Sequence, residues 1–551
     1  MHDPGPGKTQ VIPIGGVGEF GANSTIIRTE ETTILIDFGI MFPPDSKQPG
    51  VEFYINNPKL LLRQFPELSA IFITHAHEDH IGGLGFLLSI ADLPVYTMPY
   101  TAQMIEKHCS FFRIEPKIHR VELNKPELHG DLSVEFIGVT HSIAQACALA
   151  IKTPDGTIVH TGDFKVDPLP ADGHIFQSDR LKELGDKGVD LLIMDSTNAF
   201  KPGFCPSDQE IVPYIEEEIR KAQGRVFFTT FSSHMPRIKK LKRIARRTGR
   251  KIAMIGRGFE KHFEISVDTR YMERWPDVFV SIAQTEKLPD HQVIFVATGS
   301  QAEQQSALAR ICREGYKNVK AKAGDLVIFS SKAIPGNERQ LALMASDLER
   351  QGIDVVTEKM SYVHTSGHAY REDLAYMLAL TKPRTVSPIH GEFLQLLSNF
   401  HWLKSLLAEH QDALLIEDGS VVCITEDQIT LEGVVETELL PIDGGRNLPI
   451  STEVLRQRKD MMYSGLILIC ATVKGPPEQN HFQISIDGMV ERKPGTTVNL
   501  ISEILEPLNF DLNQSIEAWS EAIYLMCKRT MKRRTGGRPL IKIVINGRVT
   551  R

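Results

Sequence analysis

Short apolar and β-branched runs separated by turns recur through residues 10–42, as in VIPI, STIIR and TTILID. Runs of this length and composition predict short antiparallel β-strands. A further apolar run at residues 70–74 (AIFIT) is followed by a polar cluster and then by the apolar segment 84–91 (LGFLLSIA). This order predicts a buried strand that ends in a loop, with a helix after the loop.

The pattern changes at about residue 207, where apolar strands begin to alternate with segments of helical periodicity. The predicted elements are helices near 207–222, 235–248, 302–314 and 337–351, and strands RVFFT, KIAMI, VIFVA, LVIFS and IDVVT. This alternation predicts a parallel sheet covered by helices, inserted as a domain of its own. Short strands return at 413–450, and a small α+β unit with a helix near 515–530 ends the chain.

A chain of 551 residues is too long for a single hydrophobic core. We therefore expect an α/β protein whose first domain is made of two pieces, 1–205 and 356–450, on either side of an insertion at 206–355. A polar linker at 451–460 would then lead to a C-terminal α+β domain at 461–551.

Composition and charge exclude several classes of protein. The chain is 42% hydrophobic and 24% charged with a formal net charge of −7, so any binding to nucleic acid must use local basic patches. Its seven cysteines are scattered and include no Cys-x-x-Cys pair, which argues against a disulfide framework or a cysteine-ligated zinc site. The first ten residues are polar, and no apolar run approaches the ~18–20 residues of a membrane span. We therefore expect a cytoplasmic protein without a membrane partner.

Three imidazoles and a carboxylate fall within six residues, directly after the predicted strand at 70–74. The sequence HAHEDH places them at His75, His77, Asp79 and His80. A loop can direct the first pair one way and the second pair another, which suits two neighbouring ions. Neutral imidazole and carboxylate are ligands of zinc and manganese. The alternative, a histidine-rich surface turn, is disfavoured by the position after a buried strand.

More polar residues follow other predicted strands. His141 follows SVEFIGVT, Asp163 follows TIVHTG, Asp37 ends TTILID, and Asp195 ends VDLLIMD. A single residue of this kind is more often structural than functional. Two nucleotide-binding patterns are rejected: GVGEFG at 16–21 precedes a strand where a helix is required, and GKT at 7–9 lacks the first glycine of a phosphate loop. For residues 16–21 we expect a glycine turn.

Four segments from residue 230 onward could bind anions or phosphates. The sequences TFSSH (230–234) and GSQ (299–301) precede predicted helices, where free backbone N–H groups favour an anion but also form ordinary N-caps. Residues 237–251 hold nine basic residues in fifteen, with Ile238, Leu241 and Ile244 as the apolar stripe of a helix. That cluster is either a solvated helix face or a surface for a phosphodiester backbone. The basic turn at 532–538 leaves the same choice open.

The sequence HAHEDH resembles the signature of the metallo-β-lactamase superfamily. With a helix-rich insertion and the late motifs SGH (366–368) and PIHGE (388–392), the chain resembles the β-CASP nucleases, and within them the bacterial ribonuclease J family most closely. The matching phrases are DFGIMFP, HAHEDHIGG, TGDF, MDST, ATGSQ, IPGNE, SGH and IHGE, within residues 10–445. His234 departs from the expected Asn, and Ala302 from the usual Gly.

The resemblance implies an αββα sandwich with an inserted β-CASP domain and two divalent metal ions. Zinc is the expected ion, with manganese or magnesium as alternatives in activity. One ion would be held by His75, His77, His141 and Asp163, and the other by Asp79, His80, His390 and the shared carboxylate of Asp163. Asp37 would orient the ligands from outside.

The resemblance also implies a substrate and a mechanism. His368, oriented by Asp195, would give a proton to the leaving 3′-oxygen. The 5′-phosphate of RNA would be held by Ser232, Ser233 and His234 together with His364, Thr365, Ser366, Gly367 and His368. We expect a 5′→3′ exoribonuclease that favours 5′-monophosphate ends and also cuts internally, acting in mRNA decay and in rRNA and RNA maturation. It would form a homodimer or homotetramer and associate with other RNA-decay enzymes.

Three other functions are compatible with parts of the sequence. A DNA 5′ exonuclease of the same family would use the same metals. A small-molecule thioester or lactam hydrolase would leave the insertion and the SGH and PIHGE motifs without a purpose. A non-catalytic RNA-binding scaffold would not need a complete set of ligands. A substrate panel separates the first from a ribonuclease, and a His77→Ala comparison with a metal assay separates the last.

Overall fold

The computed structural model describes residues 5–43, 48–170, 173–303, 305–334, 337–474, 476–491, 493–511, 513–546 and 548–549. The chain forms two compact units. The first contains the residues up to Phe42 and Ile55–Leu439, and the second contains Pro43–Tyr54 and the residues from Leu440 onward.

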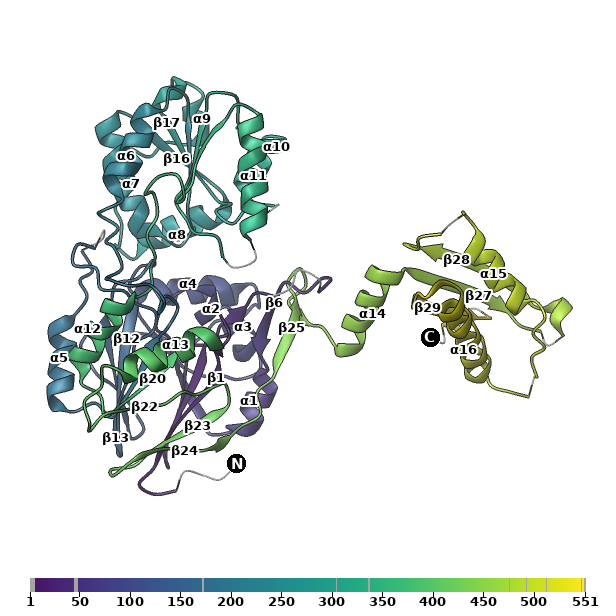
Figure 1. The fold of residues 1–551 in the computed structure, drawn as a ribbon, viewed down its shortest axis with the longest axis horizontal. Coiled ribbons are helices and arrows are strands. Elements are labelled where there is room, and N and C mark those ends of the chain that lie inside the picture. Colours follow the sequence, from purple (N-terminus) through teal and green to yellow (C-terminus); the bar gives the residue numbers. More distant parts are fainter. Residues whose placement is uncertain are drawn as a thin grey trace. The chain divides into compact units, whose positions relative to one another are not determined.

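Two sheets face each other in the core of the first unit (Figure 1). In sheet order, the first is β24 (Ile429–Val434), β23 (Ser420–Ile424), β1 (Thr9–Gly15), β3 (Ser24–Arg28), β4 (Thr33–Ile36), β7 (Leu68–Phe72), β8 (Val95–Thr97) and β9 (Ile118–Arg120). The second is β10 (Glu127–His129), β11 (Leu132–Gly138), β12 (Cys147–Thr153), β13 (Gly156–His160), β14 (Leu191–Asp195), β20 (Thr385–Ile389) and β22 (Asp412–Ala413). Short strands β2 (Val17–Gly18), β5 (Ile40–Met41), β6 (Phe53–Asn56) and β21 (Gly391–Glu392) lie outside these two sheets.

Apolar side chains fill the space between the two sheets, among them Ile27, Phe72, Phe136 and Leu149. A second cluster packs the outer faces against helices. The core helices are α1 (Pro58–Gln64), α2 (Glu78–Ile81), α3 (Leu84–Leu88), α4 (Pro99–Ser110), α5 (Ser178–Lys187), α12 (Arg371–Thr381) and α13 (Phe393–Lys404). Because both faces of each sheet are covered, most central strands are apolar throughout rather than alternating. The αββα arrangement expected from the sequence is confirmed.

The insertion is a five-stranded sheet in which every strand pair is parallel. Its order is β16 (Lys251–Ile255), β17 (Val293–Ala297), β15 (Val226–Thr229), β18 (Leu326–Phe329) and β19 (Asp354–Val356). Helices α6 (Val212–Lys221) and α7 (Met235–Thr248) cover one face, and α10 (Ala307–Arg313) and α11 (Glu338–Arg350) cover the other (Figure 1). The predicted parallel sheet is confirmed.

Helices α8 (Arg257–Asp268) and α9 (Ile282–Thr285) and the 3₁₀ turn at Asp290–Gln292 were not predicted. The buried side of α8 includes the polar residues His262 and Ser266, which interrupt the apolar stripe that would reveal the helix. None of the helices in the described part of the chain has the length and hydropathy that a bilayer span requires.

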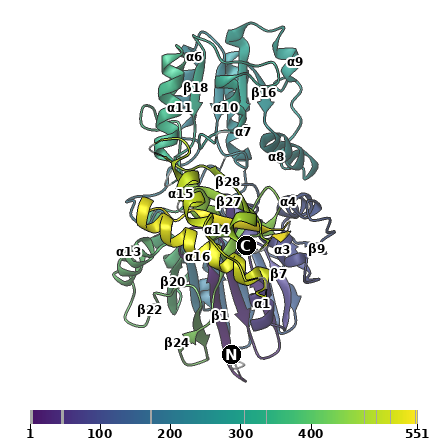
Figure 2. The same cartoon turned by 90° about the vertical axis from the view of Figure 1, so that its right-hand side faces the viewer.

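The second unit contains a four-stranded sheet with helices on one face. The sheet order is β28 (His481–Asp487), β27 (Leu466–Thr472), β29 (Leu540–Ile545) and β30 (Arg548–Val549). Helices α15 (Thr496–Leu505) and α16 (Ile516–Thr535) pack on this sheet (Figure 2). The remaining elements are strands β25 (Leu439–Asp443) and β26 (Leu448–Pro449), helix α14 (Thr452–Ser464) and a 3₁₀ turn at Pro477–Gln479.

In two places the secondary structure of this unit differs from what the sequence suggests. The stretch 451–460, expected as a linker, lies almost wholly within helix α14. The basic residues expected in a turn at 532–538 begin inside a helix, because Lys532, Arg533 and Arg534 occupy the last turn of α16. Cations at this end of a helix are favoured by its macrodipole.

Candidate metal centre and active site

Polar residues from distant parts of the chain meet beyond the ends of the core strands. Asp37 follows β4, His75 and His77 follow β7, Asp163 follows β13, and His390 follows β20. Asp79 and His80 lie in the one-turn helix α2, for which His77 is the N-cap, rather than in an open loop. This small correction gives the two side chains fixed directions.

Backbone conformation at this edge is unusual. Asp37 and His390 have φ angles of 59° and 58°, in the left-handed region that non-glycine residues seldom adopt. Gly39 allows the backbone to pass close to Asp79, since a Cβ there would lie 1.7 Å from the Asp79 carbonyl oxygen. The glycine turn expected at 16–21 is present, with positive φ at Gly16, and the Gly16 carbonyl accepts a hydrogen bond from the His390 N–H at 3.0 Å.

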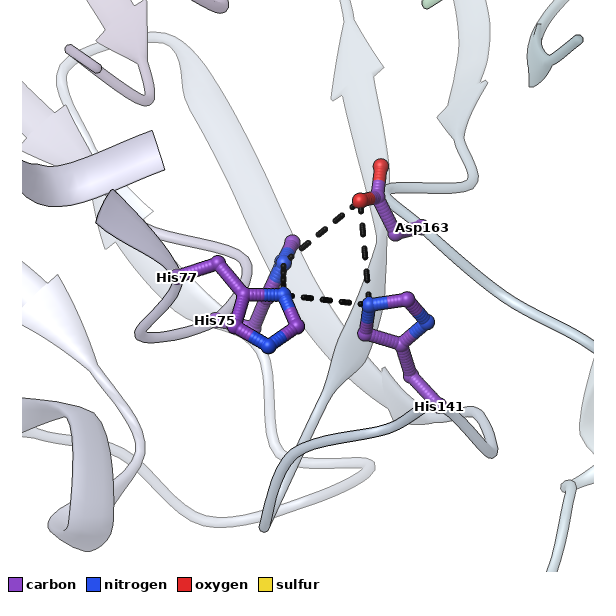
Figure 3. A group of neighbouring side chains, drawn as sticks. All are labelled: His75, His77, His141 and Asp163. Atoms are coloured by element: carbon purple, nitrogen blue, oxygen red, sulfur yellow. Dashed lines mark hydrogen bonds and ion pairs between the residues drawn. The ribbon is translucent and has the colours of Figure 1, made fainter. Parts of the chain in front are cut away.

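The first group of ligand atoms consists of three imidazole nitrogens and one carboxylate oxygen (Figure 3). His77 Nδ1 lies 3.1 Å from His75 Nε2 and 3.2 Å from His141 Nε2. Asp163 Oδ2 lies 3.7 Å from His75 Nε2 and 3.8 Å from His141 Nε2. Ligands about 2.0–2.1 Å from a tetrahedral zinc ion are about 3.3 Å apart, so the spacing fits such an ion.

The second group is built around the same carboxylate of Asp163. His80 Nε2 lies 3.4 Å from Asp163 Oδ2 and 3.6 Å from Asp79 Oδ2. His390 Nε2 lies 3.4 Å from Asp79 Oδ2 and 3.5 Å from Asp163 Oδ1. Asp163 therefore faces both groups, and all seven residues that the sequence singled out as ligands come together.

The charges of these residues fit a cation. Burial lowers the pKa of His75 and His141 well below its usual value and that of His77 to about 4, so these imidazoles are neutral and have lone pairs to share. Burial alone would raise the pKa of Asp163, but the neighbouring imidazoles of His390 and His80 hold it well below its usual range. The fold and the two clusters are compatible with divalent metal ions.

In the second group, the carboxylates favour positive charge on the imidazoles. Burial would lower the pKa of His80 and His390, but the surrounding carboxylates, Asp163 above all, raise it well above its usual value. Because histidine binds metal only through a deprotonated nitrogen, binding here would release protons.

The far side of each ligand histidine is held by a neighbour. Asp37 Oδ2 accepts from His80 Nδ1 at 2.7 Å and from Thr74 Oγ1 at 2.8 Å. Since the Thr74 hydroxyl is used in that bond, His75 Nδ1 donates to it, at 3.0 Å. The Gly367 carbonyl accepts from His141 Nδ1 at 2.7 Å. Such outer partners fix the tautomer and orientation of a ligand.

Several of these partners were not foreseen. Thr74 was noted only as the end of an apolar run, and Asn23 carried no signal. The Asn23 side-chain amide donates to the Asp79 carbonyl oxygen at 3.0 Å and lies 3.1 Å from His80 Nε2. The backbone of Asn23 also donates to that carbonyl, at 3.1 Å.

A third group adjoins the second. Asp195 Oδ2 accepts a hydrogen bond from His368 Nδ1 at 2.9 Å, and Asp195 Oδ1 lies 3.6 Å from His390 Nδ1. Burial would lower the pKa of His368, but the Asp195 carboxylate outweighs burial and the pKa is raised. Asp195 therefore stabilises the charged form of His368 beside the metal ligands, and the His368 side chain is 22% exposed.

The residues expected to hold a 5′-phosphate divide into a half-buried set and a set whose side chains bond within the protein. Ser232 and Ser366 are half-buried, and Ser233 Oγ lies 3.2 Å from His77 Nε2. His364 Nδ1 is 3.0 Å from Arg237 Nη1. Thr365 is buried and donates to the Pro206 carbonyl at 2.9 Å, and His234 caps helix α7, accepting from the Arg237 N–H.

The basic run at 237–251 proves to be only partly solvated. Arg237, Lys240 and Arg250 are buried. Lys239 and Lys242 lie over the rings of Tyr271 and Trp275, 3.9 and 3.4 Å from the ring centres. The exposed residues are Arg243, Arg246 and Arg247, and the last two form ion pairs with Asp277 and Glu216. Three of the nine basic residues are therefore buried, which the apolar stripe of the helix did not predict.

Comparison with known families divides the chain as the fold does. Residues 17–190 match the metallo-β-lactamase superfamily, residues 223–348 match the β-CASP domain of ribonuclease J, and residues 352–399 match the Zn-dependent metallo-hydrolase RNA specificity domain.

Similar proteins cover nearly the whole chain. A ribonuclease J of Thermus thermophilus is 35% identical over 549 residues, covering 98% of this chain and 95% of that protein. A ribonuclease J of Mycolicibacterium smegmatis is 33% identical, with 85% of this chain and 84% of that protein covered. A crystal structure of a protein of unknown function from Enterococcus faecalis V583 shares the fold, with a TM-score of 0.54 and 18% identity over 76% of this chain and all of that one.

Proposed function

This chain belongs to the ribonuclease J family and is a metal-dependent hydrolytic ribonuclease, and we propose that it degrades RNA stepwise in the 5′→3′ direction. It favours 5′-monophosphate ends and also cuts internally. The observation that carries the proposal is the convergence of two ligand groups on Asp163, with the protonated His368 beside them.

The first group, His75, His77, His141 and Asp163, would hold one ion, and Asp79, His80, His390 and Asp163 the other. Two divalent ions held by these residues would supply a water of lowered pKa and would stabilise the charge that builds up on the phosphoryl oxygens. We propose zinc as the resident ion because imidazole and carboxylate donors at these spacings suit it, with manganese or magnesium able to support activity.

The protein residues then divide the remaining work. Water adds to phosphorus and gives up a proton to solvent while the bond to the 3′-oxygen breaks, and His368 donates its proton to that oxygen. Asp195 holds the His368 ring through Nδ1, so that Nε2 is the nitrogen that donates. The products are a 5′-phosphate and a 3′-hydroxyl.

The 5′-end pocket is proposed from Ser232 and Ser233 on the insertion and residues 364–368 on the returning chain. Hydroxyl and backbone N–H groups there would bind the phosphate, with His234 and Thr365 supporting the pocket from behind. A pocket that holds the end at a fixed distance from the metals gives stepwise release of mononucleotides, and entry that bypasses the pocket gives internal cuts.

We further propose a setting for this activity: mRNA decay and rRNA and RNA maturation in the cytoplasm, as a homodimer or homotetramer in contact with other RNA-decay enzymes. The domain limits proposed are 1–205 with 356–450, 206–355 and 461–551. These assignments rest on the family, and sedimentation and affinity purification from cells test the assembly.

A panel of 5′-end-labelled substrates tests the activity. RNAs with a 5′-monophosphate, triphosphate or hydroxyl and a matched 5′-monophosphate DNA are incubated with the metal-loaded protein. Release of labelled mononucleotide, fastest from the monophosphate RNA, is expected. Equal or faster digestion of the DNA would replace the proposal with a DNA 5′ exonuclease, since RNA selectivity depends on 2′-hydroxyl contacts.

His77→Ala is the matched control for the chemistry. It removes one ligand, so metal content and RNA cleavage should fall together. RNA binding with no cleavage by the metal-loaded wild type would favour a scaffold instead.

A further inference from the structure

Thr197, two residues beyond strand β14, has contacts with two of the groups in the active site. Its hydroxyl Oγ1 lies 2.7 Å from Asp195 Oδ1 and 2.8 Å from His390 Nδ1. A carboxylate can only accept, so the Thr197 hydroxyl donates to Asp195. The single hydroxyl proton is then used, and His390 Nδ1 must be the donor to Thr197.

Asp195 therefore serves two imidazoles, one through each oxygen. Oδ2 accepts from His368 Nδ1, and Oδ1 is reached from His390 through Thr197. The backbone N–H of Thr197 also donates to Oδ1, at 2.9 Å, which fixes the hydroxyl against the carboxylate. Asp195 is 1% exposed, so water has little access to its carboxylate.

The same arrangement, a threonine hydroxyl between a histidine and an aspartate, occurs a second time at this edge of the core. His75 Nδ1 donates to Thr74 Oγ1, which donates to Asp37 Oδ2, and that oxygen also accepts from His80 Nδ1. There a threonine and an aspartate orient two proposed ligands, one for each ion. In the arrangement around Thr197 and Asp195, one of the two imidazoles belongs to the proposed ligand His390 and the other to His368.

We propose that Thr197 is a positioning residue that orients His390 for metal binding and His368 for proton donation through the one carboxylate of Asp195. The inference rests on the proposed function, because it assigns a role to a residue around the same site. Removing the hydroxyl would leave the buried His390 Nδ1 without its acceptor and Asp195 Oδ1 without a donor. Both rings would then be free to rotate away from their working positions.

Three variants of the full-length protein test this role. Thr197→Val keeps the size but loses the hydroxyl, and Thr197→Ser keeps the hydroxyl. Thr229→Val is the matched control, because Thr229 is a fully buried strand residue whose hydroxyl has no hydrogen-bond partner. Cleavage of 5′-monophosphate RNA, metal content after dialysis against graded chelator, and thermal unfolding are measured for each.

We expect Thr197→Val to lower kcat by about 10–100-fold with little change in KM, and to weaken retention of one of two ions by about 10–100-fold. Thr197→Ser should recover most of both losses, and Thr229→Val should match wild type. Asp195→Asn with Thr197→Val should be no slower than Asp195→Asn alone, because the two act as one unit.

The role is overturned if Thr197→Val keeps kcat within about threefold of Thr229→Val, or if Thr197→Ser is as impaired as Thr197→Val. If Thr197→Val does not fold, Thr197→Ala with the serine variant decides by the same criteria. A wild-type protein that binds two ions but leaves RNA intact would overturn the proposed function instead, and the metal retention of the variants would still test the orientation of His390.

Discussion

In both the core and the insertion, polar side chains follow the carboxyl ends of parallel strands, the edge at which α/β folds bind ligands. At the core edge, imidazoles and carboxylates from distant segments of the chain converge on common points. The nitrogens of His75, His77 and His141 meet at 3.1 and 3.2 Å, and burial lowers the pKa of all three, so three neutral imidazoles turn one nitrogen each toward a common point.

At the insertion edge the buried charge of Arg237 is matched by a carboxylate and by carbonyl oxygens. The guanidinium of Arg237 is buried and donates to Asp208 Oδ1 at 2.7 Å, to the Ser330 carbonyl at 2.7 Å and to the Thr365 carbonyl at 3.1 Å. Asp208 lies at the start of the insertion, ahead of helix α6, and Thr365 follows the insertion, so Arg237 joins the two ends of this domain. Ligand atoms that converge on one point suit a bound ion, whereas the paired charges of Arg237 and Asp208 suit a structural role behind the proposed pocket of Ser232 and Ser233.

The strongest test of this comparison is to remove the charge of Asp163 and measure RNA cleavage and bound metal. Asp163→Asn removes the charge that both ligand groups share, and we expect the rate of RNA cleavage to fall about 10³-fold or more, with loss of bound metal. Labelled-RNA assays and elemental analysis of the purified variant measure both. Retention of more than a tenth of the rate with one ion or none would show that the shared carboxylate is not the centre of the site.

Breaking the buried pair of Arg237 and Asp208 should lower the stability of the fold. Arg237→Met leaves Asp208 buried without its partner, and we expect about 3–5 kcal/mol of destabilisation, seen as a lower midpoint of thermal unfolding. Adding Asp208→Asn should restore part of the loss, because the stranded charge is then removed. Additive losses in the double variant would mean that the two residues do not act as a pair.

Sequence patterns located the ligands because each follows an apolar strand, and the family motifs set their order along the chain. They did not locate the partners of those ligands. Thr197 meets His390 across 193 residues of sequence, and nothing local to Thr197 records that contact. Thr74 and Asn23 were missed for the same reason: hydroxyl and amide groups are common, and only the fold reveals which of them touch a ligand.

Two segments show how local patterns mislead. The pattern at 237–251 correctly predicted a helix and its apolar stripe. It did not predict that Arg237 and Lys240 are also buried, because their partners Asp208 and Gln209 come from another part of the chain. Helix α14 was expected as a linker because it buries no residue and so has no apolar stripe.

The exposed remainder of the basic helix gives a smaller test. Replacing Arg243, Arg246 and Arg247 with Gln removes the three solvated charges of the run, and two of them are already in ion pairs. We expect KM for long RNA to rise about two- to fivefold at low salt with kcat unchanged, and the difference to vanish at high salt. An unchanged KM would leave the helix as a solvated face, and a fall in kcat would place it in the site.

The smallest expected effect concerns Asp418, a carboxyl group whose pKa is raised near the core edge. Asp418 accepts a hydrogen bond from the Val17 N–H at 3.0 Å, next to Gly16, whose carbonyl holds His390. Burial, with the nearby charge of Glu19, raises the pKa of Asp418 to about 8. The folded protein therefore keeps a proton that the unfolded chain releases above about pH 4, and stability falls as pH rises from there to about 8.

Asp418→Asn keeps the acceptor for Val17 and removes this titration. We expect the variant to match wild type in thermal unfolding near pH 4 and to gain on it progressively up to pH 8.5, by on the order of 1–2 kcal/mol, with RNA cleavage unchanged at neutral pH. Asp427→Asn is the matched control, because it makes the same change at an exposed position close in sequence to Asp418. A difference between Asp418→Asn and wild type that stays constant with pH would show that Asp418 is charged at this edge, as Asp163 is.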